Sequence, residues 1–296
     1  MSTQAWAELL VLGCIWGGVF LAARLALNEV GVITAVAHRT FWAALVLWTV
    51  VIAKGLTLPR SWRLWGVFMV MGLLNNLIPF ALLNWSQLYI ESGLTSIFNA
   101  TTAIFGVIAA AIFFADEKLS PRKIIGVGFG FLGVATAIGL ENLTQFDLRS
   151  IAQLAAITAT ISYAFAAVWA RKHLSDQHPE IAAAGMLTCS AVIAIPAAIL
   201  VDGPISFDLA PVTIGALAYI SVVATACAYL LYYRVMRMAG IGNLSLVTLL
   251  IPPFAIGLGA LVLGETISSN AYAGFALVAL GLLILDGRIM TWLRRS

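Results

Sequence analysis

Residues 117–133 read EKLSPRKIIGVGFGFLG, and residues 265–281 read ETISSNAYAGFALVALG. The two stretches share a glutamate, a serine and two glycines at the same spacings, with an offset of 148 positions. The matching residues are Glu117, Ser120, Gly126, Leu132 and Gly133 in the first stretch, and Glu265, Ser268, Gly274, Leu280 and Gly281 in the second. A repeat at half the length of a 296-residue chain predicts a fold made of two similar halves.

The composition indicates that lipid is the solvent for much of this chain. Apolar residues make up 62% of it and charged residues 10%, whereas a soluble domain has about 45–50% apolar and about 25% charged residues. The net charge of +3 gives no basis for nucleic-acid binding. The three cysteines, at positions 14, 189 and 227, have neither the spacing nor the histidine partners of a metal site. We therefore predict an integral membrane protein without cofactor or metal.

Ten apolar runs, each about long enough for a helix to cross a bilayer, follow one another. They cover residues 8–26, 33–53, 64–85, 93–114, 123–140, 151–171, 181–201, 211–233, 242–263 and 271–289. Each run is predicted to be a helix, because a helix satisfies its own backbone hydrogen bonds in lipid. A membrane β-barrel would need alternating stretches of about ten residues, and these runs are continuous. No basic segment precedes the first run, so we expect a retained span and not a cleaved signal peptide.

The two halves, residues 1–142 and 148–296, each contain five of these runs. Five is odd, so the second half must enter the membrane in the opposite direction, as in many secondary carriers. The first copy of the repeated turn carries Lys118, Arg122 and Lys123, and the second copy carries no basic residue, as inversion predicts. We expect the glutamate of each copy to cap or anchor the start of the following helix. We expect the repeated glycines to permit close helix packing.

Basic residues predict the orientation, since 13 of the 16 Lys and Arg residues fall on one side of the expected bundle. That side holds Lys54, Arg60, Arg63, Lys118, Arg122, Lys123, Arg171, Lys172, Arg234, Arg237, Arg288, Arg294 and Arg295, leaving Arg24, Arg39 and Arg149 elsewhere. Cytoplasmic loops are enriched in basic residues. We therefore predict a multi-pass protein of the plasma membrane, here a bacterial inner membrane, with both termini in the cytoplasm.

Two short motifs add a family resemblance to this organisation. They are Ile15-Trp16-Gly17-Gly18 in the first run and His38-Arg39-Thr40-Phe41 in the second. With the duplicated Glu-x-x-Ser-x5-Gly-x6-Gly pattern, they resemble the drug/metabolite transporter superfamily, and most of all its EamA-type ten-span carriers. The resemblance covers the whole chain. It implies an all-α membrane protein in which two inverted five-helix repeats surround a central cavity.

The resemblance also implies a small-molecule cargo. Members of this superfamily move amino acids, other metabolites and drugs, commonly outward, and one branch exports aromatic and neutral amino acids. The chain resembles that branch, so the expected function is export of a zwitterionic amino acid or similar metabolite by alternating access. The alternative is efflux of a drug or another metabolite. A channel, a non-transporting membrane subunit and an intramembrane enzyme stay open as less favoured classes.

Candidate substrate-binding residues are polar or aromatic side chains away from the ends of the runs. They are Trp16, Phe20, Asn76, Phe80, Asn99, Thr102, Tyr163, Tyr229 and Thr248. Aromatic side chains offer apolar contact and, in Tyr and Trp, a polar tip; amides in lipid are costly unless they have a partner or face water. Structural alternatives stay open: hydrogen bonds between helices for Asn75 and Asn76, core packing for the aromatic residues, and kinks for the prolines that follow Thr248.

Arg39, beside His38, is a cation within the second run. A charge at that depth is a functional hypothesis by default, although a long side chain would also reach the outer surface or serve a structural pair. No Asp or Glu lies in the middle of any run. Proton-coupled carriers commonly use a buried carboxylate, so we expect transport that does not depend on protons. The expected site is neutral rather than strongly cationic, which disfavours phosphorylated substrates such as sugar phosphates.

Overall fold

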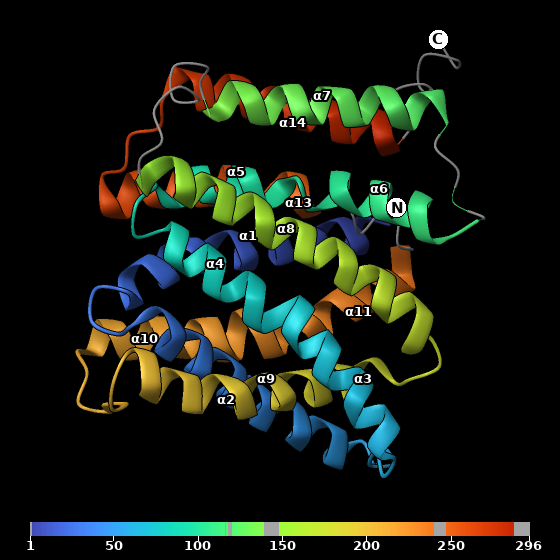
Figure 1. Cartoon of the computed structure of the whole chain (residues 1–296), viewed down its shortest axis with the longest axis vertical. Coiled ribbons are helices and arrows are strands. Elements are labelled where there is room, and N and C mark those ends of the chain that lie inside the picture. Colours follow the sequence, from blue (N-terminus) through green and yellow to red (C-terminus); the bar gives the residue numbers. More distant parts are fainter. Residues whose placement is uncertain (1, 116, 118–119, 139–147, 240–246, 287–296) are drawn as a thin grey trace.

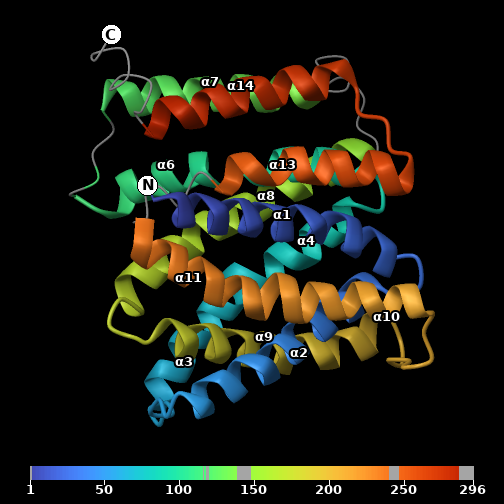
Figure 2. The ribbon, with the colours of Figure 1, turned by 180° about the vertical axis from the view of Figure 1, so that it is seen from behind.

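A computed structural model describes residues 2–115, 117, 120–138, 148–239 and 247–286. Every regular element in these ranges is a helix, and the helices run roughly parallel to one another across the molecule (Figures 1 and 2). Some residues used in the predictions lie outside the described ranges. They are Lys118, Arg288, Arg294 and Arg295, the last residues of the runs 123–140 and 271–289, and the first residues of the run 242–263.

The helices follow the predicted runs in order. In the first half they are α1 (Thr3–Ala26), α2 (Val32–Ala53), α3 (Trp62–Gly72), the π-helical segment η1 (Leu73–Leu77), α4 (Ile78–Ser86), α5 (Ser92–Ala100), α6 (Thr102–Phe113) and α7 (Pro121–Ile138). In the second half they are α8 (Leu148–His173), α9 (Pro179–Val201), α10 (Pro211–Ala218), the π-helical η3 (Tyr219–Cys227), α11 (Ala228–Ala239), α13 (Val247–Leu258), the π-helical η4 (Gly259–Leu263) and α14 (Ser269–Asp286).

Seven described helical segments are long and apolar enough to cross a membrane. They are Thr3–Ala26, Val32–Ala53, Trp62–Ser86, Ser92–Phe113, Arg149–His173, Pro179–Val201 and Pro211–Ala239. Two shorter apolar helices, Leu250–Leu263 and Ser269–Leu285, follow them. All of these segments coincide with predicted runs, so the all-helical architecture is confirmed, whereas the count of ten spans stays a prediction.

Helices α7 and α14 carry the two copies of the repeat and pack against each other at one edge of the bundle (Figures 1 and 2). A Cβ atom added at Gly126 would lie 2.8 Å from the carbonyl oxygen of Gly281. A Cβ atom added at Gly133 would lie 2.7 Å from the carbonyl oxygen of Gly274. The repeated glycines therefore allow two backbones to touch, as predicted. This pairing also requires the two copies to run antiparallel, as an inverted repeat demands.

Contacts between the halves come in corresponding pairs. Helix α8 packs on α4 and α6, and its counterpart α1 packs on α11 and α13. Helix α2 packs on η3, and its counterpart α9 packs on α3 and η1. The second helices of the two halves, α2 and α9, also pack on each other. Helices of the two halves therefore pack against one another at several places in the molecule.

The π-helical segments η1 and η3 occupy equivalent places in the third helix of each half. A π turn disturbs the regular hydrogen-bond ladder, so carbonyl groups become available to other donors. Ser162 Oγ on α8 donates to the carbonyl of Leu74 in η1 at 2.7 Å. Trp16 Nε1 on α1 donates to the carbonyl of Ala224 in η3 at 3.1 Å. Each donor lies on the first helix of the opposite half, so these bonds join the halves at mid-span.

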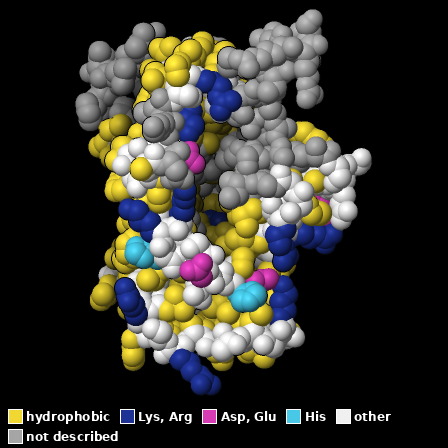
Figure 3. Space-filling model, turned by 90° about the vertical axis from the view of Figure 1, so that its right-hand side faces the viewer, with side chains coloured by type: hydrophobic (Ala, Val, Ile, Leu, Met, Phe, Trp, Pro, Cys, Tyr) yellow, Lys and Arg dark blue, Asp and Glu magenta, His cyan; other side chains and the backbone are white. Residues whose placement is uncertain are grey.

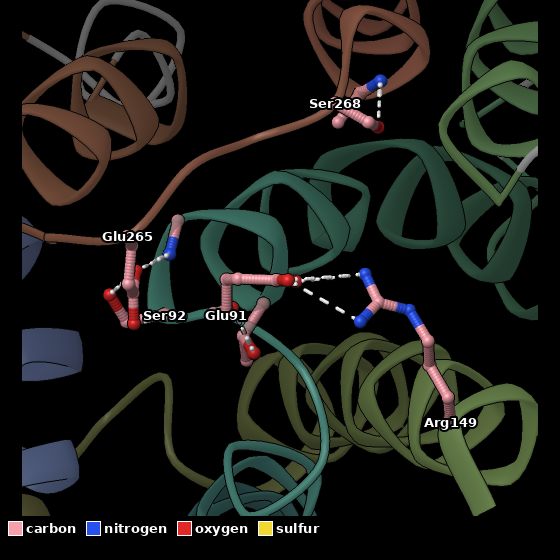
Figure 4. Close-up of polar contacts among 8 residues, drawn as sticks. Glu91, Ser92, Arg149, Glu265 and Ser268 are labelled. Atoms are coloured by element: carbon pink, nitrogen blue, oxygen red, sulfur yellow. Dashed lines mark hydrogen bonds and ion pairs between the residues drawn. The ribbon is translucent and has the colours of Figure 1, made fainter. Parts of the chain in front are cut away.

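The repeated turn corrects one prediction. Glu265 caps α5 of the opposite half and not the following helix α14: its carboxylate accepts hydrogen bonds from Ser92 N at 3.0 Å and Ser92 Oγ at 2.7 Å (Figure 4). The cause is the loop after η4, where Gly264 takes a positive φ of 65° before Glu265. The cap of α14 is Ser268, whose Oγ accepts from Ala271 N at 3.2 Å. In the first copy, Glu117 does anchor α7, through Lys123 Nζ at 2.9 Å.

Candidate functional site

Arg39 stands at the centre of a cluster drawn from both halves. It lies two turns into α2, and its Nε donates to Thr225 Oγ1 on η3 at 2.9 Å. Its guanidinium carbon lies 3.6 Å from the centre of the Phe80 ring on α4. A cation over an aromatic face is stabilised by about 2 kcal/mol when it is desolvated. Arg39 therefore stays deep in the bundle and does not extend to the outer surface.

Two tyrosines from the second half complete the surroundings of Arg39. Tyr163 on α8 and Tyr229 on α11 both lie near its guanidinium. Tyr163 packs against the apolar cluster that contains Phe80 and also against the one that contains Phe98 on α5. The Arg39 cluster, defined as Arg39, Phe80, Tyr163, Thr225 and Tyr229, therefore joins α2 and α4 of the first half to α8, η3 and α11 of the second.

A network of amides lies next to Tyr229. Asn75 Nδ2 donates to Tyr229 Oη at 3.2 Å, and Tyr229 Oη lies 3.4 Å from Asn76 Oδ1. Asn76 is fully buried, and its Nδ2 donates to Ser190 Oγ on α9 at 3.1 Å. Both asparagines sit in η1. The two amides are thus partnered between helices, and Asn76 is linked through Tyr229 to the Arg39 cluster.

Several of these side chains are deep in the bundle and still have accessible surface. Arg39, Tyr163 and Tyr229 are surrounded by protein, yet each is only half-buried. These side chains therefore keep some accessible surface inside the bundle. Figure 3 views the end of the molecule where α2 finishes and α3 begins, and this face carries Lys and Arg side chains around a hollow near its centre.

Trp16 and Phe20 form a second wall on α1. Phe20 is buried with Ile251 and Ala255 of α13, and Trp16 packs against this group. The Trp16 ring also lies 5.7 Å from that of Tyr232 on α11. Its bond to the carbonyl of Ala224 places it beside the Arg39 cluster, because the next residue, Thr225, accepts the bond from Arg39. One turn of η3 therefore positions both Trp16 and Arg39.

Comparison with known proteins agrees with this two-part architecture. The EamA-like transporter family matches residues 5–139 and again residues 150–285. The chain belongs to this family. One solved crystal structure of a protein shares the fold over 98% of this chain and 99% of its own, with a TM-score of 0.69 at 16% identity.

Relatives of this EamA-like transporter carry transport names. An uncharacterized transporter of Archaeoglobus fulgidus is 24% identical over 281 residues, which is 95% of this chain and 98% of the relative. A probable terminal-alkyne amino-acid exporter of Streptantibioticus cattleyicolor is 24% identical and covers 98% of this chain and 95% of its own. A probable amino-acid metabolite efflux pump of Salmonella typhimurium is 24% identical over 65% of this chain and 67% of its own.

The remaining candidate substrate-binding residues of this EamA-like chain lie on the fourth helix of each half. Thr102 Oγ1 donates to the carbonyl of Asn99 at 2.7 Å, at the break between α5 and α6. Asn99 Oδ1 is buried without a hydrogen-bond partner among the described residues. Thr248 is half-buried in the first turn of α13. Within the described part of the chain, no hydrogen bond joins Asn99 or Thr102 to the Arg39 cluster, so their place in the substrate site stays a prediction.

Hydroxyl groups at the centre of the bundle are the side chains around the candidate site that the sequence did not single out. Thr225, Ser162 and Ser190 each bond a residue of another helix in the centre of this EamA-like bundle. For Thr225 the sequence did offer a sign of this role. Thr225 stands four residues after Ser221, so the two hydroxyl groups share one helical face within an apolar run. Serine and threonine also occur in membrane helices as local bonds to the preceding turn, so position alone did not distinguish the two roles.

Proposed function

We propose that this EamA-like transporter exports zwitterionic amino acids or closely similar metabolites by alternating access. The main support is the Arg39 cluster, in which both halves supply partly accessible polar and aromatic side chains. A small site of aromatic walls and few polar groups suits a small metabolite with an apolar part. The names of two relatives, an amino-acid exporter and an amino-acid metabolite efflux pump, support the substrate class. The family supports a carrier over an intramembrane enzyme.

The proposed topology has ten spans and both termini in the cytoplasm of a bacterial cell. The seven candidate spans and two shorter apolar helices would be joined by α7 as the fifth span. The basic face in Figure 3 would be cytoplasmic, because basic residues are retained on that side. The opposite end carries carboxylates that cap helices, such as Asp202 on Thr34 N at 2.7 Å and Glu265 on Ser92 N at 3.0 Å.

Alternating access requires contacts between the halves that open at one end at a time. At the proposed outer end, Asp202 and Glu265 of the second half hold the starts of α2 and α5 of the first. At the cytoplasmic end, Lys54 pairs with Glu180 at 2.6 Å, and Arg234 pairs with Glu8 at 2.8 Å. Each of these contacts joins one half to the other. We propose that the two sets form and break in turn during transport.

Counterflow in proteoliposomes tests the proposal. The purified protein is reconstituted with unlabelled L-phenylalanine, L-leucine or L-threonine inside, and uptake of the same labelled amino acid is measured. A carrier gives uptake that is stimulated by internal substrate and absent from protein-free liposomes. Leu261→Ala, at a side chain 85% exposed, is a matched control that should transport like the wild type. Uptake without stimulation by internal substrate would indicate a pore, and no uptake of any amino acid would reject the substrate class.

A further inference from the structure

Arg39 has hydrogen-bond donors that the protein does not use. A guanidinium carries five N–H groups, and the single hydrogen bond of Arg39 to a described residue comes from Nε to Thr225. The two terminal nitrogens make no hydrogen bond within the described residues. If they were fully buried, they would count among the buried polar atoms without a partner, and they do not. They therefore have accessible surface. The unused fork of N–H groups is therefore open to a further partner.

The charge of Arg39 is not neutralised by a side chain. The described ion pairs use other residues, and none of them includes Arg39. The ring of Phe80 covers one face of the guanidinium, and the Thr225 hydroxyl occupies Nε. Neither group carries a negative charge. A buried charge is costly without an ionic partner. The guanidinium of Arg39 is therefore suited to bind an anion.

The surroundings fit a group with a single negative charge. The planar fork of arginine matches a carboxylate through two parallel hydrogen bonds. The hydroxyl of Tyr163, which lies near Arg39, is a further polar group of the site, whereas the Tyr229 hydroxyl is engaged with Asn75 and Asn76. A doubly charged phosphate would leave an excess negative charge, because the other two arginines off the basic side, Arg24 and Arg149, are engaged near helix ends with the Gln87 carbonyl and Glu91. A carboxylate balances the site.

We infer that Arg39 binds the carboxylate of the cargo, so that this transporter selects metabolites with a free carboxylate and rejects their amides and the corresponding amines. The inference rests on the proposed function and specifies which group of the substrate the site recognises. In the bound state the carboxylate occupies both terminal nitrogens of Arg39, while Phe80 and Thr225 hold the guanidinium in place. The apolar part of the cargo then lies against the aromatic side chains of the cluster.

Matched substrates test the inference without any mutation. Uptake of labelled L-phenylalanine and L-leucine is measured in counterflow, and unlabelled L-phenylalaninamide, 2-phenylethylamine and 3-phenylpropanoate are added as competitors. We expect 3-phenylpropanoate to compete, and the amide and the amine to compete at least tenfold more weakly than L-phenylalanine. Equal competition by the acid and the amide would overturn the role of the carboxylate while leaving amino-acid transport intact. If L-phenylalanine, L-leucine and L-threonine all fail to be transported, the proposed function itself is rejected, and this inference with it.

Two substitutions then assign the effect to Arg39. Arg39→Gln should lower L-phenylalanine uptake about a hundredfold and remove the preference for the acid over the amide, whereas Arg39→Lys should keep part of both. Arg149→Gln removes an arginine that pairs with Glu91 at 2.9 Å near the start of α8 and should leave the preference unchanged. Size-exclusion profiles and melting temperatures check folding. If Arg39→Gln lowers uptake but keeps the wild-type preference for the acid, Arg39 has a structural role only.

Discussion

The guanidinium carbon of Arg39 lies 3.6 Å from the centre of the Phe80 ring, and the two residues belong to different helices of the same half. The pair holds a charge inside the helical bundle, and it does so without an acidic partner among the described residues. Two features of the sequence meet here, because Phe80 follows the paired asparagines and Arg39 lies in the motif of the second run.

Replacing Phe80 by Leu tests this stacking. Leucine keeps most of the volume and removes the π face, so we expect a loss of about 1–2 kcal/mol in addition to any packing cost. Phe68→Leu is the matched control, because Phe68 is also fully buried and has no cation over its ring. Thermal unfolding of both purified variants measures the difference. Equal losses at the two positions would show that the stacking contributes nothing.

The glycine contact between α7 and α14 predicts a sharp contrast within one helix. Gly133→Ala places a methyl group 2.7 Å from the carbonyl oxygen of Gly274, so the helices must move apart, at a cost of about 1–3 kcal/mol. Gly128→Ala meets no atom within 4 Å and should be neutral or slightly stabilising, since alanine favours helix. Melting temperatures in one detergent compare the variants. A Gly133→Ala protein as stable as the wild type would contradict the described packing.

The topology predicts opposite labelling of two exposed serines. In a background with Cys14, Cys189 and Cys227 replaced by serine, Ser269→Cys should react with an impermeant thiol reagent added to intact cells. Ser120→Cys should react only after the membrane is permeabilised. Both positions are exposed, at the starts of α14 and α7 respectively. Labelling of Ser120→Cys from outside would reject the proposed inverted insertion.

Transport should not depend on a proton gradient. No Asp or Glu in the described residues contacts the Arg39 cluster, so the cluster offers no carboxylate to carry a proton with the cargo. Initial rates of uptake into proteoliposomes should be equal with an imposed pH gradient of either sign and with a protonophore. Accumulation of L-phenylalanine driven by the pH gradient, and lost with the protonophore, would show that the coupling prediction is wrong.

The hydroxyl of Tyr163 should affect substrate preference more than folding. Tyr163→Phe keeps the packing on α8 and removes a polar group near Arg39, so we expect a several-fold fall in uptake with little change in melting temperature. Tyr163→Ala should reduce uptake further or change the preferred side chain. Tyr89→Phe, at a tyrosine beyond the end of α4, is the control and should behave like the wild type. Wild-type uptake by both Tyr163 variants would remove this residue from the site.

Helix position was predictable because length and polarity suffice to find it. The run 33–53 becomes α2 at Val32–Ala53, and the run 64–85 becomes the segment Trp62–Ser86. The rotation of each helix about its own axis was not predictable, because a helix that is apolar on every side gives no signal of which face meets a neighbour. The π-helical turns were missed for a different reason. The bond from Trp16 to the Ala224 carbonyl uses a backbone acceptor, and a backbone carbonyl leaves no mark in the sequence.

The site was predictable as a set of residue types and less so as an arrangement. Asn76, Phe80, Tyr163 and Tyr229 were proposed from their polarity or aromaticity at mid-depth. The structure places Phe80, Tyr163 and Tyr229 near Arg39 and links Asn76 to Tyr229, and their role in binding stays a prediction. Thr225 and Ser190 were missed, since hydroxyl groups in membrane helices usually bond their own helix. Glu265 was assigned to the wrong helix because its partner, Ser92, is far away in sequence.

The pairing of Gly126 with Gly281 and of Gly133 with Gly274 is self-complementary, as in the interface of a dimer with two-fold symmetry. Two separate half-length chains inserted in opposite directions would make the same contact without a linker. The covalent joining of the halves has a consequence for the charge. Position 187, which corresponds to Arg39 at the offset of 148, is a leucine. A homodimer would place two arginines around its axis, whereas the joined chain holds one cation in a symmetric scaffold and can match a single carboxylate.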